Sequence, residues 1–295
     1  NVDVIVGTVH SGVTMAMAKA ARETGTILIV PNAGADAVTG PMCAPNIFRS
    51  SFSNWQQGYA MGDVVAKKGH KKVMTITWKY AAGDEVVKSF KEAFEKGGGK
   101  VTEELSLPFP NVEFQALLTA IAAAKPDAVY TFFAGAGAVK FVKDYSAAGL
   151  KGRIPLYSTG FLTDGTLEAM GRDAEGIETT LHYADGLDSV RDKGFRLAYA
   201  KTFKSAPDVY AVQGYDAAQM LSVGLSAVGG DVKRKTELIA AMEKATIDSP
   251  RGRFTMSKNH NPVQDIYLRK VVGTENKLAG IASKALSDPG RGCRM

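Results

Sequence analysis

Ser11 stands where a serine is well placed to bind an anion. It follows the apolar run Asp3–Gly7, typical of a buried strand, and precedes the small and apolar residues of 13–24, which predict a helix. The first N–H groups of a helix have no partner within it, so a hydroxyl beside them completes an anion site. We therefore predict a carboxylate-binding corner here. The alternative for Ser11 is a plain helix N-cap, and for the adjacent His10 it is a solvent-facing turn position.

A second small and polar turn follows the next predicted strand. The run ILIV at 27–30 is again apolar, as in a buried parallel strand. It ends in Pro31, Asn32, Ala33 and Gly34. In an open parallel sheet the loops at the carboxyl ends of the strands line the ligand crevice. We therefore expect both turns to lie at one crevice.

The middle of the chain alternates strand-like and helix-like segments. Strand-like runs begin at Val73, Val101, Ala128 and Ile154. Amphipathic segments lie between them at 85–95, 113–124 and 138–148. Repeated units of strand and helix predict parallel strands joined by right-handed crossovers. The predicted fold class is therefore α/β, with doubly wound parallel sheets.

The first and last parts of the chain are expected to form another domain, since 295 residues favour two domains over one. Later segments predict helices at 192–203, 209–228 and 236–245, and strands at 252–255 and 265–272. The tail from Ser287 is expected to be irregular.

Composition excludes two classes of protein. The hydrophobic share of 45% and the charged share of 22% are ordinary for a globular chain, and no stretch of about 18 apolar residues suggests a membrane span. The net charge of +6 is dispersed, and its densest cluster, 67–72, fits a solvated turn at a helix end. We therefore predict no nucleic-acid partner.

Cys43 and Cys293 are the two cysteines, and neither has the spacing of a metal site or a CxxC motif. They are either buried free thiols or a disulfide, which is the preferred interpretation and requires an oxidising compartment. The four histidines are scattered, so no metal site is predicted.

Four stretches, in this order, resemble the periplasmic substrate-binding proteins of ABC importers, in the branch of the leucine/isoleucine/valine-binding proteins. They are IVGTVHSGVTMAMAKAARETG, TILIVPNAGADAVT, NIFRSSFSNWQQGYAMGDVVAK and PDVYAVQGYDAAQMLSVGL. The tail GRGCRM is also similar to that branch. The resemblance implies a type I fold, in which two doubly wound lobes joined by three crossovers close on a ligand.

The resemblance also implies the lobe boundaries. The first lobe would combine 1–48 with 184–250, the second 53–178 with 260–295, and the hinge would lie near 48–52, 179–183 and 252–259. The family usually has about two further βα units before the position of Asp3. The chain opens almost directly on a strand, without a signal peptide, so we expect a processed or truncated chain whose first lobe has an open strand edge.

Ligand contacts are implied at the loops that follow the strands of both lobes. In the family, the first lobe holds the ligand carboxylate and an aromatic residue of the second lobe covers the ligand. The residues that match, or lie beside, these positions are His10, Ser11, Asn32, Ala33, Gly34, Trp78, Tyr80, Phe133, Gly135, Gly160, Phe161 and Tyr210. Tyr80 could instead be an ordinary surface residue, and Trp78 could fill the core.

The residues at 158–161 bear on the class of ligand. Amino-acid binders of this family hold the ligand ammonium with a carboxylate near this position, whereas Ser-Thr-Gly-Phe offers no acid. A buried ammonium without an anionic partner is costly. We therefore predict an aromatic carboxylate of the benzoate, phenylacetate or cinnamate type. The alternative ligands are branched-chain or other amino acids.

Other classes of protein fit less well. The segment GTVHSG at 7–12 is not the GxGxxG of a dinucleotide enzyme, and Ser11 lacks the GxSxG of a hydrolase. A ligand-sensing regulator with the same fold stays open. We predict a monomeric periplasmic binding protein that is not an enzyme, carries no cofactor and delivers its ligand to a permease in the membrane.

Overall fold

A computed structural model describes residues 2–295, and its chain divides into two compact units. Unit 1 contains residues 2–54, Gly186–Asp265 and Lys284–Met295. Unit 2 contains Trp55–Asp185 and Ile266–Ser283. Each unit is thus built from segments that are distant in the sequence.

Unit 1 contains a three-stranded parallel sheet in the order β1-β2-β3. Its strands and helices are β1 (Val4–Val6), α1 (Ser11–Thr24), β2 (Ile27–Val30), α2 (Asp36–Thr39), β3 (Ile47–Arg49), α8 (Val190–Phe203), α9 (Val209–Ala227) and α10 (Lys235–Glu243). Two short strands, β9 (Thr246–Ile247) and β10 (Phe254–Met256), pair antiparallel with each other.

Apolar side chains bury both faces of the β1-β2-β3 sheet. On one face, Leu28 and Val30 pack with Ala18 and Ala21 of α1. On the other face, Ile27 and Ile29 pack with residues of α9 and α10. Burial on both faces is the arrangement expected of parallel strands, and it explains why ILIV is a continuous apolar run.

Unit 2 contains a larger sheet whose strands run in the order β5-β4-β6-β7-β8, all parallel. The antiparallel β11 adds to β8, and β12 pairs with β11. The strands are β4 (Lys72–Lys79), β5 (Lys100–Pro108), β6 (Ala128–Phe132), β7 (Leu156–Thr159), β8 (Glu178–Leu181), β11 (Pro262–Val272) and β12 (Glu275–Leu286). The start of β11, up to Asp265, and the end of β12, from Lys284, belong to unit 1. The predicted α/β class with parallel sheets is confirmed.

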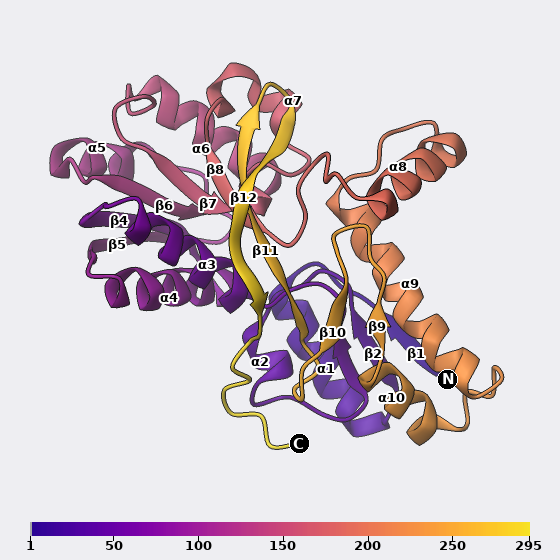
Figure 1. Ribbon diagram of the computed structural model, residues 1–295. Helices are drawn as coiled ribbons and strands as arrows, with labels where there is room; N and C mark the ends of the chain where they lie inside the picture. Colours follow the sequence, from indigo (N-terminus) through magenta and orange to yellow (C-terminus); the bar gives the residue numbers. More distant parts are fainter. Residues whose placement is uncertain (1) are drawn as a thin grey trace. The chain divides into compact units, whose positions relative to one another are not determined.

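Helices cover the two faces of this sheet (Figure 1). They are α3 (Asn54–Lys67), α4 (Ala81–Lys96), α5 (Gln115–Ala124), α6 (Gly135–Ala147) and α7 (Leu167–Met170), with the 3-10 turns η1 (Gly160–Leu162) and η2 (Gly171–Ala174). Residues of α3 and α4 form one apolar core with the sheet. Residues of α5, α6 and α7 form the other.

Cys43 and Cys293 form a disulfide, the preferred of the two interpretations above. The bond joins the loop after α2 to the last residues of the chain, within unit 1. This explains one difference from the expected lobes: residues 284–295, expected in the second lobe, belong to unit 1. The strand β12 was not predicted, because its alternation of apolar and polar residues is weak.

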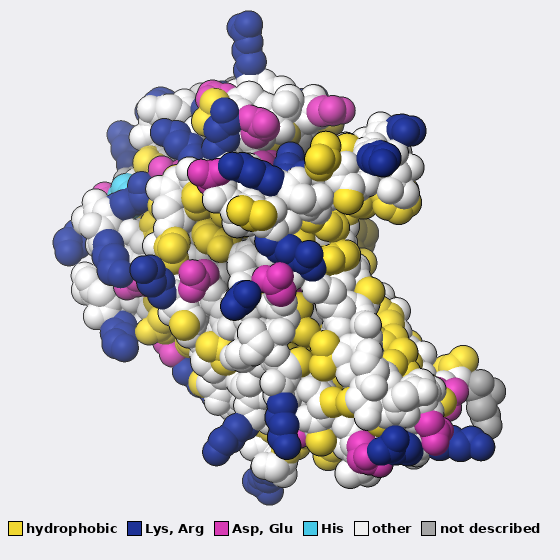
Figure 2. Space-filling model, turned by 45° about the vertical axis from the view of Figure 1, so that its right-hand side comes forward, with side chains coloured by type: hydrophobic (Ala, Val, Ile, Leu, Met, Phe, Trp, Pro, Cys, Tyr) yellow, Lys and Arg dark blue, Asp and Glu magenta, His cyan; other side chains and the backbone are white. Residues whose placement is uncertain are grey.

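Within residues 2–295, every helix is too short or too polar to cross a membrane. On the face shown in Figure 2, Lys and Arg side chains are spread out, with Asp and Glu side chains between them. The net positive charge is therefore distributed over this face rather than gathered into one patch.

Candidate functional site

The carboxyl ends of β1 and β2 in unit 1 carry most of the predicted polar residues. Ser11 is the first residue of α1, and Asn32–Gly34 follow β2. The N–H of Ala33 donates to the carbonyl oxygen of Thr8 at 2.9 Å, so the two turns are adjacent. We call the following set the polar edge: His10, Ser11, Asn32, Ala33, Gly34 and Tyr210.

Ser11 lies at the start of α1, next to the N-cap residue. The residue at the N-cap of α1 is His10, not Ser11, so the plain-cap alternative does not describe this serine. Ser11 as a residue is 3% exposed and is the first residue of the 14-residue helix α1. A hydroxyl beside the first N–H groups of a helix is suited to a carboxylate.

Asn32 and Ala33 both donate hydrogen bonds to acceptors within unit 1. The side-chain amide of Asn32 donates to Oε1 of Gln213 on α9 at 2.7 Å. The N–H of Ala33 is bonded to Thr8, as described above. These contacts hold the second turn in place, and they engage the N–H of Ala33 and one of the two N–H donors of the Asn32 amide.

Gly34 fits where no larger residue would. A Cβ atom there would lie 2.1 Å from Oδ1 of Asn54 and 2.6 Å from Cε2 of Phe52. Its carbonyl oxygen also accepts from the N–H of Asn54 at 2.7 Å. The glycine therefore serves close packing of the turn against the start of α3.

Arg49, which was not predicted from the sequence, stabilises the turn that follows β2. Its guanidinium is fully buried and donates to the carbonyl oxygens of Ala33 and Ala35 and to Oγ1 of Thr39. The signal in the sequence was an arginine at the end of the apolar strand IFR, where a charge is unexpected.

Tyr210 and His10 complete the polar edge. Tyr210 lies in the first turn of α9, three residues before Gln213, and is 38% exposed. His10 is half-buried, and its ring lies close to Gly12, where an added Cβ would come within 3.1 Å of Cε1. His10 directly precedes Ser11, and Tyr210 precedes Gln213, the residue that bonds the Asn32 amide, by three positions of α9.

The carboxyl ends of β4, β6 and β7 in unit 2 carry the other predicted residues. We call these residues the aromatic edge: Trp78, Tyr80, Phe133, Gly135, Gly160 and Phe161. They come from three neighbouring parallel strands, so the sheet places them along one edge.

Trp78 and Phe133 are core residues. Their rings pack edge to face, with centroids 5.1 Å apart, and Phe133 also contacts Phe114 and Phe141. The indole N–H of Trp78 donates to the carbonyl oxygen of Asn111 at 2.7 Å. Both side chains are buried in the core under α5 and α6, as the alternative for Trp78 allowed.

Tyr80 and Gly135 lie at the two helix starts of this edge. Tyr80 is the N-cap residue of α4, is half-buried, and packs against Phe109 with ring centroids 5.1 Å apart. Burial raises the pKa of Tyr80, so its phenol stays neutral and able to donate. Gly135 begins α6 with a φ of 56°, and open space lies where a Cβ would be.

Gly160 packs tightly against a buried ion pair. A Cβ at Gly160 would lie 2.6 Å from Nη2 of Arg269 and 2.7 Å from Cδ2 of Leu181. Arg269 binds the carboxylate of Asp164 through two contacts, of 2.8 and 3.2 Å. The charge of Asp164, the acid that follows β7, is therefore balanced by Arg269. Phe161, in η1, is buried beside it.

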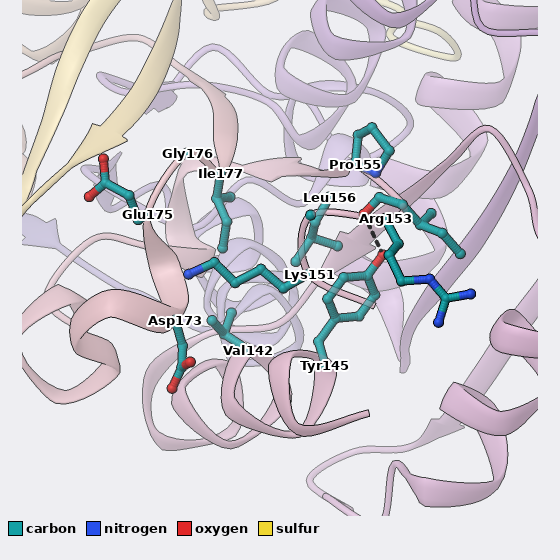
Figure 3. Close-up of a pocket in the computed structure, with 12 residues that line it drawn as sticks. Val142, Tyr145, Lys151, Arg153, Pro155, Leu156, Asp173, Glu175, Gly176 and Ile177 are labelled. Atoms are coloured by element: carbon teal, nitrogen blue, oxygen red, sulfur yellow. Dashed lines mark hydrogen bonds between the residues drawn. The ribbon is translucent and has the colours of Figure 1, made fainter. Parts of the chain in front are cut away.

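Unit 2 also has a cavity of about 350 Å³ at the opposite end of β7 (Figure 3). Its walls include Val142, Leu156 and Ile177, and the hydroxyl of Tyr145 donates to the carbonyl oxygen of Ile154 at 2.9 Å. The charged residues around it are Lys151, Arg153, Asp173 and Glu175. It shares no residue with the aromatic edge.

The chain is similar to known proteins along most of its length. The sequence profile of the family described as periplasmic binding protein matches residues 1–276. A curated relative, the Leu/Ile/Val-binding protein homolog 6 of Brucella melitensis biotype 1, is 29% identical over 270 residues. That match covers 89% of this chain and 68% of the relative.

Solved structures are more similar. A solute-binding protein of an ABC transporter from R. palustris, in complex with benzoate, is 52% identical with a TM-score of 0.95, over 99% of this chain and 81% of that one. A solute-binding protein of Rhodopseudomonas palustris BisB5, in complex with 3,4-dihydroxybenzoic acid, is 35% identical with a TM-score of 0.89. The match covers 98% of this chain and 80% of that one.

Proposed function

This chain belongs to the periplasmic binding protein family, and we propose that it is the solute-binding component of an ABC importer that captures a small aromatic carboxylate. The observation that carries the proposal is the 52% identity, over nearly the whole chain, with a solute-binding protein in complex with benzoate. The residues of the polar and aromatic edges also favour an aromatic carboxylate as the ligand.

The polar edge supports the carboxylate. Ser11 offers a hydroxyl, on a residue that is 3% exposed, at the positive end of a helix dipole. A charge-assisted hydrogen bond to a carboxylate is among the stronger bonds a neutral side chain makes. An anionic ligand therefore fits this corner without a full cation.

The aromatic edge argues against an amino acid. An α-ammonium needs a nearby carboxylate, and Asp164 is bonded to Arg269 instead. Burial raises the pKa of Tyr80, so this residue of the edge is a neutral ring with a polar tip. A ligand with a flat apolar ring and no amine fits these side chains better than leucine does.

The second candidate is a branched-chain or other amino-acid binder. It is favoured by the curated relatives, which are named Leu/Ile/Val-binding protein homologues. In either case the proposed role is binding rather than catalysis, the location is the periplasm and the partner is a membrane permease. The lobe closure that the resemblance implies stays a prediction.

Isothermal titration calorimetry with three compounds tests the proposal. Benzoate is expected to bind, whereas leucine and benzyl alcohol, which lacks the carboxylate, are expected to give no measurable heat. Binding of leucine with no response to benzoate would establish the amino-acid alternative. Equal binding of benzyl alcohol and benzoate would remove the assigned role of the carboxylate.

A further inference from the structure

Arg49 is a charged side chain in an unexpected place. It is the last residue of the apolar strand β3 and is 0% exposed, so its guanidinium lies wholly within unit 1. Burial of a charged group is costly unless hydrogen bonds replace the water that it loses. The hydrogen bonds that Arg49 makes therefore indicate its role.

The guanidinium fixes the direction of two carbonyl groups in the turn after β2. Nη1 donates to the carbonyl oxygen of Ala33, and Nη2 donates to that of Ala35 at 2.6 Å. A guanidinium is a rigid planar fork, so its donors hold the two carbonyl oxygens at a set spacing. A lysine, which has one ammonium group on a flexible stem, cannot reproduce this geometry.

The direction of the Ala33 carbonyl determines where the next N–H points. The peptide bond between Ala33 and Gly34 is trans, and the C=O and N–H groups of a planar trans peptide point in opposite directions. Because the carbonyl oxygen of Ala33 faces the guanidinium of Arg49, the N–H of Gly34 points away from it. Gly34 belongs to the polar edge, and backbone N–H groups bind oxyanions through charge-assisted hydrogen bonds.

Ala33 is also tied to the turn that carries Ser11. Its N–H donates to the carbonyl oxygen of Thr8 at 2.9 Å. The residue is therefore held at both of its backbone polar groups, by the first turn and by Arg49. Loss of the arginine contact would leave the bond to Thr8 in place and free the peptide unit after Ala33 to rotate.

Asn261 orients the guanidinium. This residue lies between β10 and β11 and is 0% exposed, and its Oδ1 accepts from Nε of Arg49 at 2.7 Å. Nδ2 of Asn261 has no hydrogen-bond partner among the described residues, so the oxygen is the atom of this amide that holds the arginine. An aspartate at this position would supply the same acceptor.

We propose that Arg49, oriented by Asn261, is a positioning residue for ligand binding, because it keeps the N–H of Gly34 directed towards the ligand carboxylate. The inference rests on the proposed function, since it assumes that a carboxylate binds at the polar edge. It does not depend on the aromatic ring, because benzoate and leucine both carry a carboxylate.

Calorimetric dissociation constants of Arg49→Lys test this role. The variant keeps the positive charge but loses the fork, so benzoate should bind about tenfold more weakly, as loss of one hydrogen bond to a charged group would give. Arg251→Lys is the matched control and should leave benzoate affinity unchanged. Arg251 is also a buried arginine of unit 1, and its guanidinium bonds Asp216, Gln264 and the carbonyl oxygen of Ser50.

NMR spectra separate positioning from a general loss of stability. Benzoate should shift the amide proton resonance of Gly34 downfield in the wild type, because that proton gains a hydrogen bond to an anion. At saturating benzoate the shift should be much smaller in Arg49→Lys. Asn261→Leu, which removes the acceptor for Nε, should weaken binding in the same way, whereas Asn261→Asp should retain the wild-type affinity.

Unchanged affinity in Arg49→Lys, or an equal loss in Arg251→Lys, overturns the inference and leaves the proposed function standing. So does wild-type binding of benzoate without a shift of the Gly34 amide, a result that needs no variant. If Arg49→Lys does not fold, equal benzoate affinities of Asn261→Leu and Asn261→Asp contradict the positioning role. Failure of the wild type to bind benzoate overturns the proposed function, and leucine then tests the inference alone; binding of neither compound overturns both.

Discussion

The polar edge of unit 1 and the aromatic edge of unit 2 occupy equivalent places, at the carboxyl ends of parallel strands, yet they use their predicted residues differently. In the polar edge, Ser11 places a hydroxyl at the start of α1. In the aromatic edge, Trp78 and Phe133 are packed into the core.

This difference shows that a residue directly after a parallel strand can be placed for ligand binding or can belong to the core. A polar residue in the first turn of a helix lies beside N–H groups that have no partner within the helix, so its side chain is placed to bind an anion. An aromatic residue at the end of a strand has an apolar core directly beneath it, and burial in that core stabilises the fold. Substitutions should therefore change stability at the aromatic edge and binding at the polar edge.

The largest expected effect is that of Phe133→Ala. Removing a fully buried ring that contacts Trp78, Phe114 and Phe141 should lower the free energy of unfolding by about 4 kcal/mol. Urea denaturation measures it. Phe203→Ala, which removes a ring that is 62% exposed, is the control and should change stability little. Similar stability of the two variants would place Phe133 outside the core.

Arg269→Met is expected to have the next largest effect. It leaves the Asp164 carboxylate buried without its cation, which should cost about 3 kcal/mol of stability. The exposed Arg153→Met in the same unit is the matched control for loss of an arginine. Restoration of stability by Asp164→Leu in the Arg269→Met background would support the pairing. Unchanged stability of Arg269→Met alone would refute it.

Ser11→Ala should weaken benzoate binding by about 1–3 kcal/mol, since it removes a buried hydrogen bond to a charged group. Its effect on unfolding should be small. Ser189 offers a control in the same unit, because its hydroxyl caps α8 by accepting from the N–H of Asp192 at 2.9 Å. Ser189→Ala should lower stability by about 1 kcal/mol and leave benzoate affinity unchanged. The reverse pattern would reduce Ser11 to a structural residue.

The smallest effect concerns pH and the amino end of β4. Burial lowers the pKa of His70 below its ordinary value of 6.5. The unfolded chain then takes up this proton at a higher pH than the folded chain, so stability is fully present above 6.5 and falls as the pH drops through that value towards the folded pKa. His70→Gln should flatten the dependence of unfolding free energy on pH between 7 and 5. An unaltered slope would contradict this.

Much of the framework was predictable from the sequence. Continuous apolar runs such as ILIV and AVYTFF, separated by amphipathic segments, indicate parallel strands under helices, and the structure has them at those positions. The place of Ser11 at a helix start was also predictable from the sequence, and its role as an anion site stays a prediction. The disulfide was one of two open interpretations, since spacing alone does not join Cys43 to Cys293.

The rest depends on contacts between distant segments. Arg49 meets the carbonyl oxygens of Ala33 and Ala35, and Arg269 meets Asp164 from more than a hundred residues away. No local pattern predicts such partners. The amide of Asn32 looked free for a ligand until α9 brought Gln213 beside it.

A crystal structure of this protein with benzoate tests the central claim most directly, because the claim concerns the placement of one functional group. We predict a carboxylate oxygen of benzoate within hydrogen-bond distance of Oγ of Ser11, at the start of α1. A complex in which benzoate is bound elsewhere and the Ser11 hydroxyl has no contact with it would contradict the account.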